Sequence, residues 1–532
     1  MFRLGRSLNL RSCFRRFGTK TAPAESSSSS INGGKKSPTE IPLSQPLPDF
    51  PPPLYASVSE RDQQETKVTR LANGIRVASQ PKFGQFCTIG MLIDSGSRYE
   101  VAYPSGISHF LEKLAFQSTK NFTSRDAIMQ YLEKYGGICD AQISRDSAVY
   151  ASSVESQGYD AVVKLLNDIS RQMLISEKEL VEVRQAVKFD LEDLAKRYEQ
   201  DSLLTEMIHK AAYRENTLGL PRLCPPENVD KIDRKTLFSY LSQYYTPSRM
   251  VIAGVGIDHG ALIESTEKYF CSSKAVWEED PSLVLPSASK LPADASVAQY
   301  TGGEVRIEKD LSSAALGPST IPELAHFALG FQSSSHVDED FVPFCVLNIL
   351  MGGGGSFSAG GPGKGMYTRL YTNALNKHHY LYSATAFNHS YIDSGLFCIL
   401  ASSPPESVAE MVATVVEQFQ QMAGPVGEEE LNRAKTQLSS MLMMQLESRP
   451  VIFEDIGRQV LAYGHRKTAK TLLEQIDSVT AEDIQRVAER MLRTKPSVAC
   501  LGKLSAFPSY SDIQGMFTSV EPQKKKRFSL FL

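Results

Sequence analysis

One short segment of the sequence carries most of an inverted zinc-binding motif. His109, Glu112 and Lys113 lie within residues 105–116, where apolar side chains recur at helical spacing. Positions i, i+3 and i+4 of a helix share one face, so His-x-x-Glu-His presents two imidazoles to one Zn²⁺ and a glutamate to the metal-bound water. Here a lysine replaces the second histidine, and an ammonium has no lone pair for a metal. The motif is therefore degenerate, and we interpret its residues as a capped or salt-bridged remnant with Lys113 in the former metal cavity.

A second segment, residues 351–366, is rich in glycine. Eight of the fourteen residues from 352 to 365 are glycine. The segment follows an expected helix and contains no GxxxxGK[ST], which excludes a phosphate loop and a dinucleotide fingerprint. It is either a flexible connection or a mobile flap whose backbone pairs with an extended peptide, with apolar contact from Phe357 and Met366. The candidate peptide-binding residues are Gly352, Gly353, Gly354, Gly355, Ser356, Phe357, Gly360, Gly361, Gly363, Lys364 and Gly365.

The parts of the chain that position these two segments repeat the same order of sequence patterns in its two halves. Four short patterns recur in the same order, about 240 to 250 residues apart. The pairs are 88–93 with 327–331, 146–150 with 393–397, 177–180 with 428–431, and 247–254 with 495–502. In both copies strands alternate with amphipathic helices, which we expect at 160–173 and 406–422 and from 177 and 428 onward. The order predicts a duplicated α+β unit with its boundary near residues 275–300.

Composition divides the chain into five parts. Residues 1–24 hold six cations and no acid among Phe and Leu side chains, which indicates a mitochondrial transit peptide, with a basic arm for nucleic acid or lipid as the alternative. Residues 25–66 form a linker rich in Ser, Pro and Gly that cannot fold by itself. We expect the first α+β domain at 67–280, the second at 301–510 and a basic tail at 511–532.

The composition also excludes several classes of protein. Hydrophobic residues make up 42% and charged residues 22% of the chain, as in soluble globular proteins. No apolar run approaches the roughly 20 residues of a membrane span. Eight cysteines are scattered without a CxxC pair, which suits a reducing compartment. Without the leader's six cations, 51 basic and 60 acidic side chains give a net charge of −9, which argues against a nucleic-acid-binding protein.

Residues 106–116, with the repeated plan and the basic leader, closely resemble the pitrilysin-type metallopeptidases, and among them the mitochondrial processing peptidases. The resemblance covers roughly residues 65–510 and implies two homologous α+β repeats, each a mixed β-sheet flanked by helices. In that branch a catalytic subunit with an intact HxxEH pairs with a homologous subunit whose motif is broken. The family's third metal ligand is a glutamate on a later helix. In this sequence its position falls on Phe189 or Asp190, so we expect no metal site.

The resemblance implies a non-catalytic, substrate-recognition role in the mitochondrial matrix. The chain is then expected to hold no cofactor, with zinc in a homologous partner subunit that carries the intact motif. The expected ligands are presequence peptides of imported precursors, captured by the flap, with Arg369 and Tyr371 either shaping the peptide cavity or serving only helix packing. Candidate acids for presequence arginines are Asp190, Glu192, Asp193 and Glu428–Glu430.

Two other functions stay open as alternatives. The first is an active metallopeptidase with unusual ligands, against which Lys113 argues. The second is a structural core subunit of the respiratory cytochrome bc complex at the inner membrane, alone or together with the processing role. Core subunits of that kind usually lack a glycine-rich flap, so residues 352–365 favour the processing peptidase.

Overall fold

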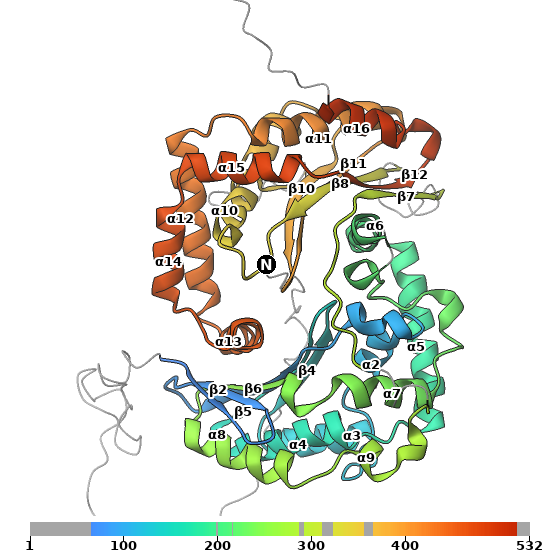
Figure 1. Cartoon of the computed structure of the whole chain (residues 1–532), viewed down its shortest axis with the longest axis vertical. Helices are drawn as coiled ribbons and strands as arrows, with labels where there is room; N and C mark the ends of the chain where they lie inside the picture. Colours follow the sequence, from blue (N-terminus) through green and yellow to red (C-terminus); the bar gives the residue numbers. More distant parts are fainter. Residues whose placement is uncertain are drawn as a thin grey trace, which may run out of the picture. The chain divides into compact units, whose positions relative to one another are not determined.

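The computed structural model describes residues 65–197, 200–214, 216–286, 292–310, 323–355 and 365–518. The expected leader, residues 25–64 of the linker, residues 356–364 of the glycine-rich segment and residues 519–532 of the tail lie outside these ranges. Figure 1 shows two sheets, each with helices packed on it. In the part of the chain that the structure describes, no helix is both long enough and apolar enough to cross a membrane.

The first half of the chain forms a mixed sheet. Within the described residues the strand order is β1-β2-β6-β3-β5-β4, with β2 parallel to β6 and all other neighbours antiparallel. The strands are β1 (Lys67–Arg70), β2 (Arg76–Gln80), β3 (Phe86–Ile93), β4 (Ile138–Ile143), β5 (Ala148–Glu155) and β6 (Met250–Val255). Strand β3 is buried from Cys87 to Ile93, as its continuous apolar sequence predicts for a central strand covered on both faces.

The second half repeats this arrangement. Its strands are β7 (Gly303–Glu308), β8 (Ala325–Ser333), β9 (Gly353–Gly355), β10 (Ser383–Ser390), β11 (Gly395–Ser403) and β12 (Ser497–Gly502). In the described ranges their order is β7-β12-β8-β11-β10-β9, with β7 parallel to β12 and the rest antiparallel. The run β7-β12-β8-β11-β10 matches β2-β6-β3-β5-β4 in both order and direction. The predicted fold of two homologous repeats, each a mixed sheet flanked by helices, is therefore confirmed.

The helices also recur in the two halves. Those of the first half are α2 (Ile107–Leu114), α3 (Arg125–Glu133), α4 (Tyr159–Arg171), α5 (Glu177–Lys196), α6 (Asp201–Tyr213), α7 (Arg234–Tyr244), α8 (His259–Thr266) and α9 (Val276–Glu279). Those of the second half are α10 (Phe341–Met351), α11 (Val408–Met422), α12 (Glu428–Gln445), α13 (Arg449–Tyr463), α14 (Ala469–Ser478), α15 (Ala481–Leu492) and α16 (Tyr510–Thr518). Helix α5 starts with a capping box in which Ser176 and Glu179 satisfy each other's backbone N–H groups.

Each sheet is covered on one face by a helix from the other half of the chain. Helix α6 packs Leu204 and Ile208 among Leu396 and Leu501 of the second sheet. Helix α13 packs against β6 and β3, and Figure 1 shows it next to the first sheet. The contact between α13 and the first sheet is close and requires glycine at position 457, where an added Cβ would lie 2.0 Å from Leu92 Cδ1. The sequence repeat did not predict this exchange of helices.

Candidate functional site

Helix α2 places the three residues of the degenerate motif, and Glu100 holds its first turn. The buried Glu100 carboxylate accepts hydrogen bonds from Gly106 N at 2.6 Å and Ser108 N at 2.7 Å. Burial raises its pKa to about 7, although the hydrogen bonds oppose that rise. Gly106 has φ +118°, and a Cβ there would lie 2.4 Å from the Cys224 Sγ atom. Sequence analysis missed Glu100 because it lies outside the helix and its periodic pattern.

His109 uses both ring nitrogens within the protein. The Cys224 backbone N–H donates to Nδ1 at 3.3 Å, so Nε2 carries the proton and lies 3.2 Å from Asp190 Oδ2. Burial lowers the pKa of His109, and the nearby Lys113 ammonium acts in the same direction, against Asp190. The imidazole is therefore held as a neutral donor to a carboxylate.

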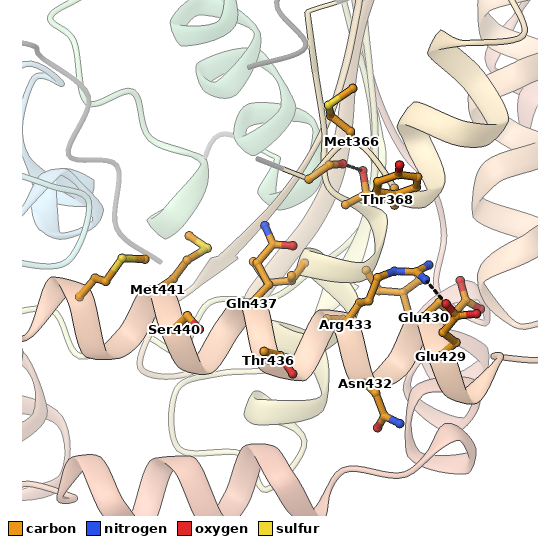
Figure 2. A pocket seen from close by; sticks show the side chains of 16 residues that line it. Met366, Thr368, Glu429, Glu430, Asn432, Arg433, Thr436, Gln437, Ser440 and Met441 are labelled. Carbon is orange, nitrogen blue, oxygen red and sulfur yellow. Dashed lines mark hydrogen bonds and ion pairs between the residues drawn. The ribbon is translucent and has the colours of Figure 1, made fainter. Parts of the chain in front are cut away.

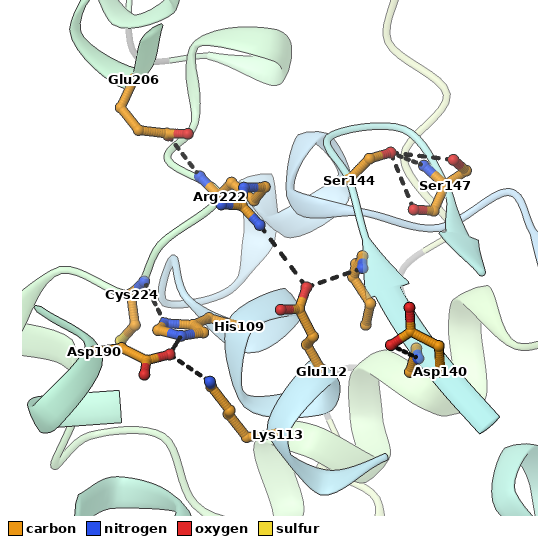
Figure 3. A network of polar contacts seen from close by, with 12 residues as sticks. His109, Glu112, Lys113, Asp140, Ser144, Ser147, Asp190, Glu206, Arg222 and Cys224 are labelled. Carbon is orange, nitrogen blue, oxygen red and sulfur yellow. Dashed lines mark hydrogen bonds and ion pairs between the residues drawn. The ribbon is translucent and has the colours of Figure 1, made fainter. Parts of the chain in front are cut away.

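Lys113 forms an ion pair with the same oxygen of Asp190 (Figure 3). Of the two positions expected for the third ligand, Asp190 is the one that reaches the motif, whereas the Phe189 side chain is 68% exposed. Burial opposes ionisation of Asp190, but hydrogen bonds from Lys113 and His109 outweigh it and lower the pKa of that carboxyl. The ammonium thus neutralises the carboxylate that an intact motif would direct at a metal ion.

Glu112 is tied to the neighbouring edge strand. Its Oε2 atom accepts a hydrogen bond from Ile143 N in β4 at 3.0 Å and lies 3.8 Å from the Arg222 guanidinium. The Arg222 backbone N–H in turn donates to Glu206 at 2.9 Å. In the described residues, no three His, Cys, Asp or Glu side chains lie close enough together to hold a metal ion.

The start of the glycine-rich segment is an edge strand. Gly353–Gly355 form β9, which pairs with residues 383–385 of β10. Gly353 has φ +98°, and an added Cβ would lie 2.1 Å from the Ala384 carbonyl oxygen, while one at Gly354 would lie 2.5 Å from the Tyr371 hydroxyl. Residues 352–355 were expected at the start of a flexible connection or a mobile flap; of these, Gly353–Gly355 form an edge strand that packs closely against β10. The flap candidates Ser356, Phe357, Gly360, Gly361, Gly363 and Lys364 lie outside the described residues.

Arg369 and Tyr371 lie in the segment that packs against β9. The buried Arg369 guanidinium makes two hydrogen bonds to Glu430, at 3.1 and 2.6 Å, and donates to the Gln421 carbonyl oxygen at 3.1 Å. Burial opposes the charge on Glu430, but the bond from Arg369 lowers the pKa of that carboxyl. Tyr371 is also buried. Arg369 therefore anchors the chain after the glycine run to α11 and α12.

Three of the other acids proposed for presequence arginines pair with a basic residue four positions further along the chain. Glu192 lies 3.8 Å from Lys196, and Asp193 pairs with Arg197. Glu429 lies 3.4 Å from Arg433, and its side chain is 94% exposed. Glu428 is exposed on the first turn of α12. At the start of α12, Glu428 and Glu429 are therefore exposed, whereas Glu430 is paired with Arg369.

A groove of about 660 Å³ lies beside β9. Its walls are α10, α12 and the segment from Gly365 to Thr368. Figure 2 shows Gln437 and Met441 projecting from α12 on the side where Met366 and Thr368 lie, and Arg433 paired with Glu429 at the start of that helix. Thr368 joins the groove to the strand, because its Oγ1 accepts from Gly353 N at 3.3 Å and donates to the Gly365 carbonyl at 2.7 Å.

Comparison with known proteins gives the family of this fold and motif. The family model described as insulinase (peptidase family M16) matches residues 76–226, and the model described as the peptidase M16 inactive domain matches residues 231–438. The chain belongs to peptidase family M16. Among its M16 relatives, the mitochondrial-processing peptidase subunits alpha of Homo sapiens and Bos taurus are each 55% identical over 491 residues, 92% of either chain. That of Caenorhabditis elegans is 43% identical over 488 residues, 90% of this chain and 92% of its own.

The two M16 matches divide the candidate site in a consistent way. The insulinase match contains the degenerate motif on α2 and Asp190 on α5. The match to the inactive M16 domain contains β9, Arg369 and Tyr371, and most of the groove. The degenerate motif therefore lies in the part that matches the insulinase model, and the glycine-rich segment lies in the part that matches the inactive domain.

Proposed function

We propose that this chain is the non-catalytic, substrate-recognition subunit of a mitochondrial processing peptidase. It acts in the mitochondrial matrix beside a homologous catalytic subunit that carries an intact HxxEH and the zinc ion. Its ligand is the presequence of an imported precursor, a basic amphipathic peptide that the partner cleaves. The shared name of the relatives supports this assignment, and the match to an inactive domain supports a role without catalysis.

The observation that carries the proposal is the ion pair between Lys113 and Asp190. A zinc site of this kind needs a second imidazole and a carboxylate with free lone pairs. Here an ammonium stands in place of the imidazole and neutralises the carboxylate, and the His109 Nε2–H donates a hydrogen bond to the same oxygen. The residues present do not fit a zinc ion, so we derive no catalytic step on this chain.

Reconstitution tests the subunit role. The chain is purified alone, together with a homologous M16 subunit that has an intact motif, and with that subunit's motif glutamate replaced by glutamine. Each sample is incubated with a presequence peptide, and cleavage is followed by mass spectrometry. We expect cleavage only with the intact partner. Recovery of the chain from mitochondria with the cytochrome bc complex but without such a partner would favour the structural alternative.

The edge strand β9 supports a route for presequence binding. It is the last strand in its sheet, so among the described residues one of its edges has no neighbouring strand. Backbone amides and carbonyls at an open edge pair with an extended peptide whatever its side chains. Glycine leaves that backbone unhindered, which suits a receptor for presequences of diverse sequence. Arg369 and Tyr371 act by positioning this segment.

A matched pair of glycine variants tests the edge. Gly353→Ala brings a Cβ 2.1 Å from a backbone oxygen at φ +98°, whereas no described atom lies within 4 Å of a Cβ at Gly355. In the assembled dimer, Gly353→Ala is expected to weaken presequence binding about tenfold, the equivalent of ~1.4 kcal/mol. Gly355→Ala is expected to change it less than about twofold. Fluorescence anisotropy measures the affinity, and gel filtration checks assembly. Equal affinities in two assembled dimers would exclude β9 as the binding edge.

Import to the matrix gives a separate test. We propose that residues 1–24 are removed after import, since the segment is cationic and free of acids. N-terminal sequencing of the protein from isolated mitochondria should find a start near the end of this segment. A chain that still begins at Met1 or Phe2 would contradict the proposal.

A further inference from the structure

The groove beside β9 occupies the place in the second half that the degenerate motif occupies in the first. The motif lies where α2 packs on α5, next to β4. The groove lies where α10 packs on α12, next to β10, the counterpart of β4 in the repeated strand order. One fold unit thus presents an equivalent concave site twice, and the two copies differ in the side chains that line them.

The difference is a replacement of carboxylates by methionines. Asp190 is the fourteenth residue of α5, and Met441 is the fourteenth of α12. Continuing along both helices, Glu192 corresponds to Met443, and Asp193 to Met444. Met441 is 37% exposed and Met444 is 66% exposed, and both line the groove, whereas Met443 does not. Unbranched, polarisable methionine side chains adapt to apolar partners of different shape.

We propose that this methionine-lined groove binds apolar side chains of the basic amphipathic peptide whose backbone lies along β9. The inference rests on the proposed function and adds a specificity site to it. Side chains of an extended peptide alternate between the two faces of the sheet, so every second one is directed to the face that α10 covers. Ile349, Met366, Met441 and Met444 offer apolar contact there.

The charges around the groove favour a basic peptide as its occupant. At one end lie Glu428, Glu429 and Glu430 on the first turn of α12. Glu430 is neutralised by the buried Arg369, and Glu429 faces solvent, 3.4 Å from the half-exposed Arg433. A peptide with cations among apolar residues complements both the acidic end and the apolar floor, whereas an acidic segment does not complement the first and a wholly polar segment does not complement the second.

The test uses the assembled dimer and two labelled peptides of equal charge. The first peptide has the sequence of residues 1–24 of this chain, and the second has each Phe and Leu replaced by Ser. The dimer carries the wild-type chain, the double variant Met441→Gln/Met444→Gln, or the control Met443→Gln from the same helix. Binding is measured by fluorescence anisotropy. The double variant is expected to weaken binding of the first peptide about tenfold, roughly the loss of one buried apolar side chain.

The other expectations follow from the same contact. The double variant should leave binding of the serine peptide unchanged, and Met443→Gln should bind both peptides like the wild type. Unchanged affinity for the first peptide in the double variant overturns the groove proposal while leaving the proposed function intact. If the wild-type dimer binds neither of the two peptides, the proposed function itself is overturned. Loss of dimer assembly in the double variant overturns the groove proposal by making the groove a subunit interface.

Discussion

Replacing Lys113 by methionine tests whether its ammonium holds the remnant motif together. The Lys113 and Asp190 side chains are 31% and 37% exposed, so solvent screens part of their attraction. We therefore expect a coupling free energy of about 0.5–1 kcal/mol. A double-mutant cycle with Asp190→Asn, measured by urea unfolding, isolates this coupling from the separate effects of each substitution.

The same variant should change the titration of His109. The Lys113 charge contributes to the lowered pKa of His109, while Asp190 opposes it. Removing the ammonium leaves the carboxylate, so the pKa of His109 should rise relative to the wild type. NMR of protein labelled at the histidine rings measures it, with His109→Gln assigning the signal among nine histidines. A coupling near zero together with an unmoved His109 pKa would refute the view that Lys113 stands in for the metal's charge.

Three further predictions concern stability. Glu430→Gln should lower the free energy of unfolding by about 2–3 kcal/mol, because it removes the charge paired with the buried Arg369. The control Glu429→Gln, in an exposed pair, should change the free energy of unfolding by less than about 0.5 kcal/mol. Equal effects of the two variants in urea unfolding would contradict this prediction. Gly457→Ala should lower the free energy of unfolding by about 2 kcal/mol or more, because the new Cβ meets Leu92 and displaces α13 from the first sheet. A decrease of less than ~0.5 kcal/mol, measured by thermal unfolding, would argue against that packing. His109 has a lowered pKa in the fold, so its contribution to stability is complete above about pH 6.5 and is lost as the pH falls toward the folded pKa. Between pH 7.5 and pH 5, the free energy of unfolding should therefore fall less for His109→Gln than for the wild type. Equal losses of stability in the two proteins would contradict the lowered pKa of His109.

Short patterns that recur in the same order were sufficient to predict a duplicated α+β unit. Buried strands such as β3 and β8 are continuous apolar runs, and capped helices such as α5 start at clear local signals. The exchange of α6 and α13 between the two halves was not predictable in this way. It depends on which sheet each helix packs against, and on glycines such as Gly457 whose purpose is visible only once Leu92 lies opposite.

The candidate site was predictable where residue type alone decides the chemistry. Lys113 cannot be a zinc ligand whatever its surroundings, and the sequence also limited the third position to Phe189 or Asp190. Which of these reaches the motif depends on the rotation of α5 against α2, and this appears only in the structure. The composition of the glycine run indicates backbone freedom and did not predict the strand β9, in which glycine at 353 and 354 allows close packing. Met441 and Met444 carried no sequence signal, since their meaning comes from the three-dimensional repeat.

Metal analysis of the isolated chain tests the central claim most directly. The chain, purified without a partner and dialysed against zinc-free buffer, is examined by mass spectrometry for bound zinc and then incubated with a presequence peptide. With Lys113 paired to Asp190 in place of a second histidine, we expect no stoichiometric zinc and no cleavage. About one tightly held zinc per chain, together with cleavage of the peptide, would contradict the account.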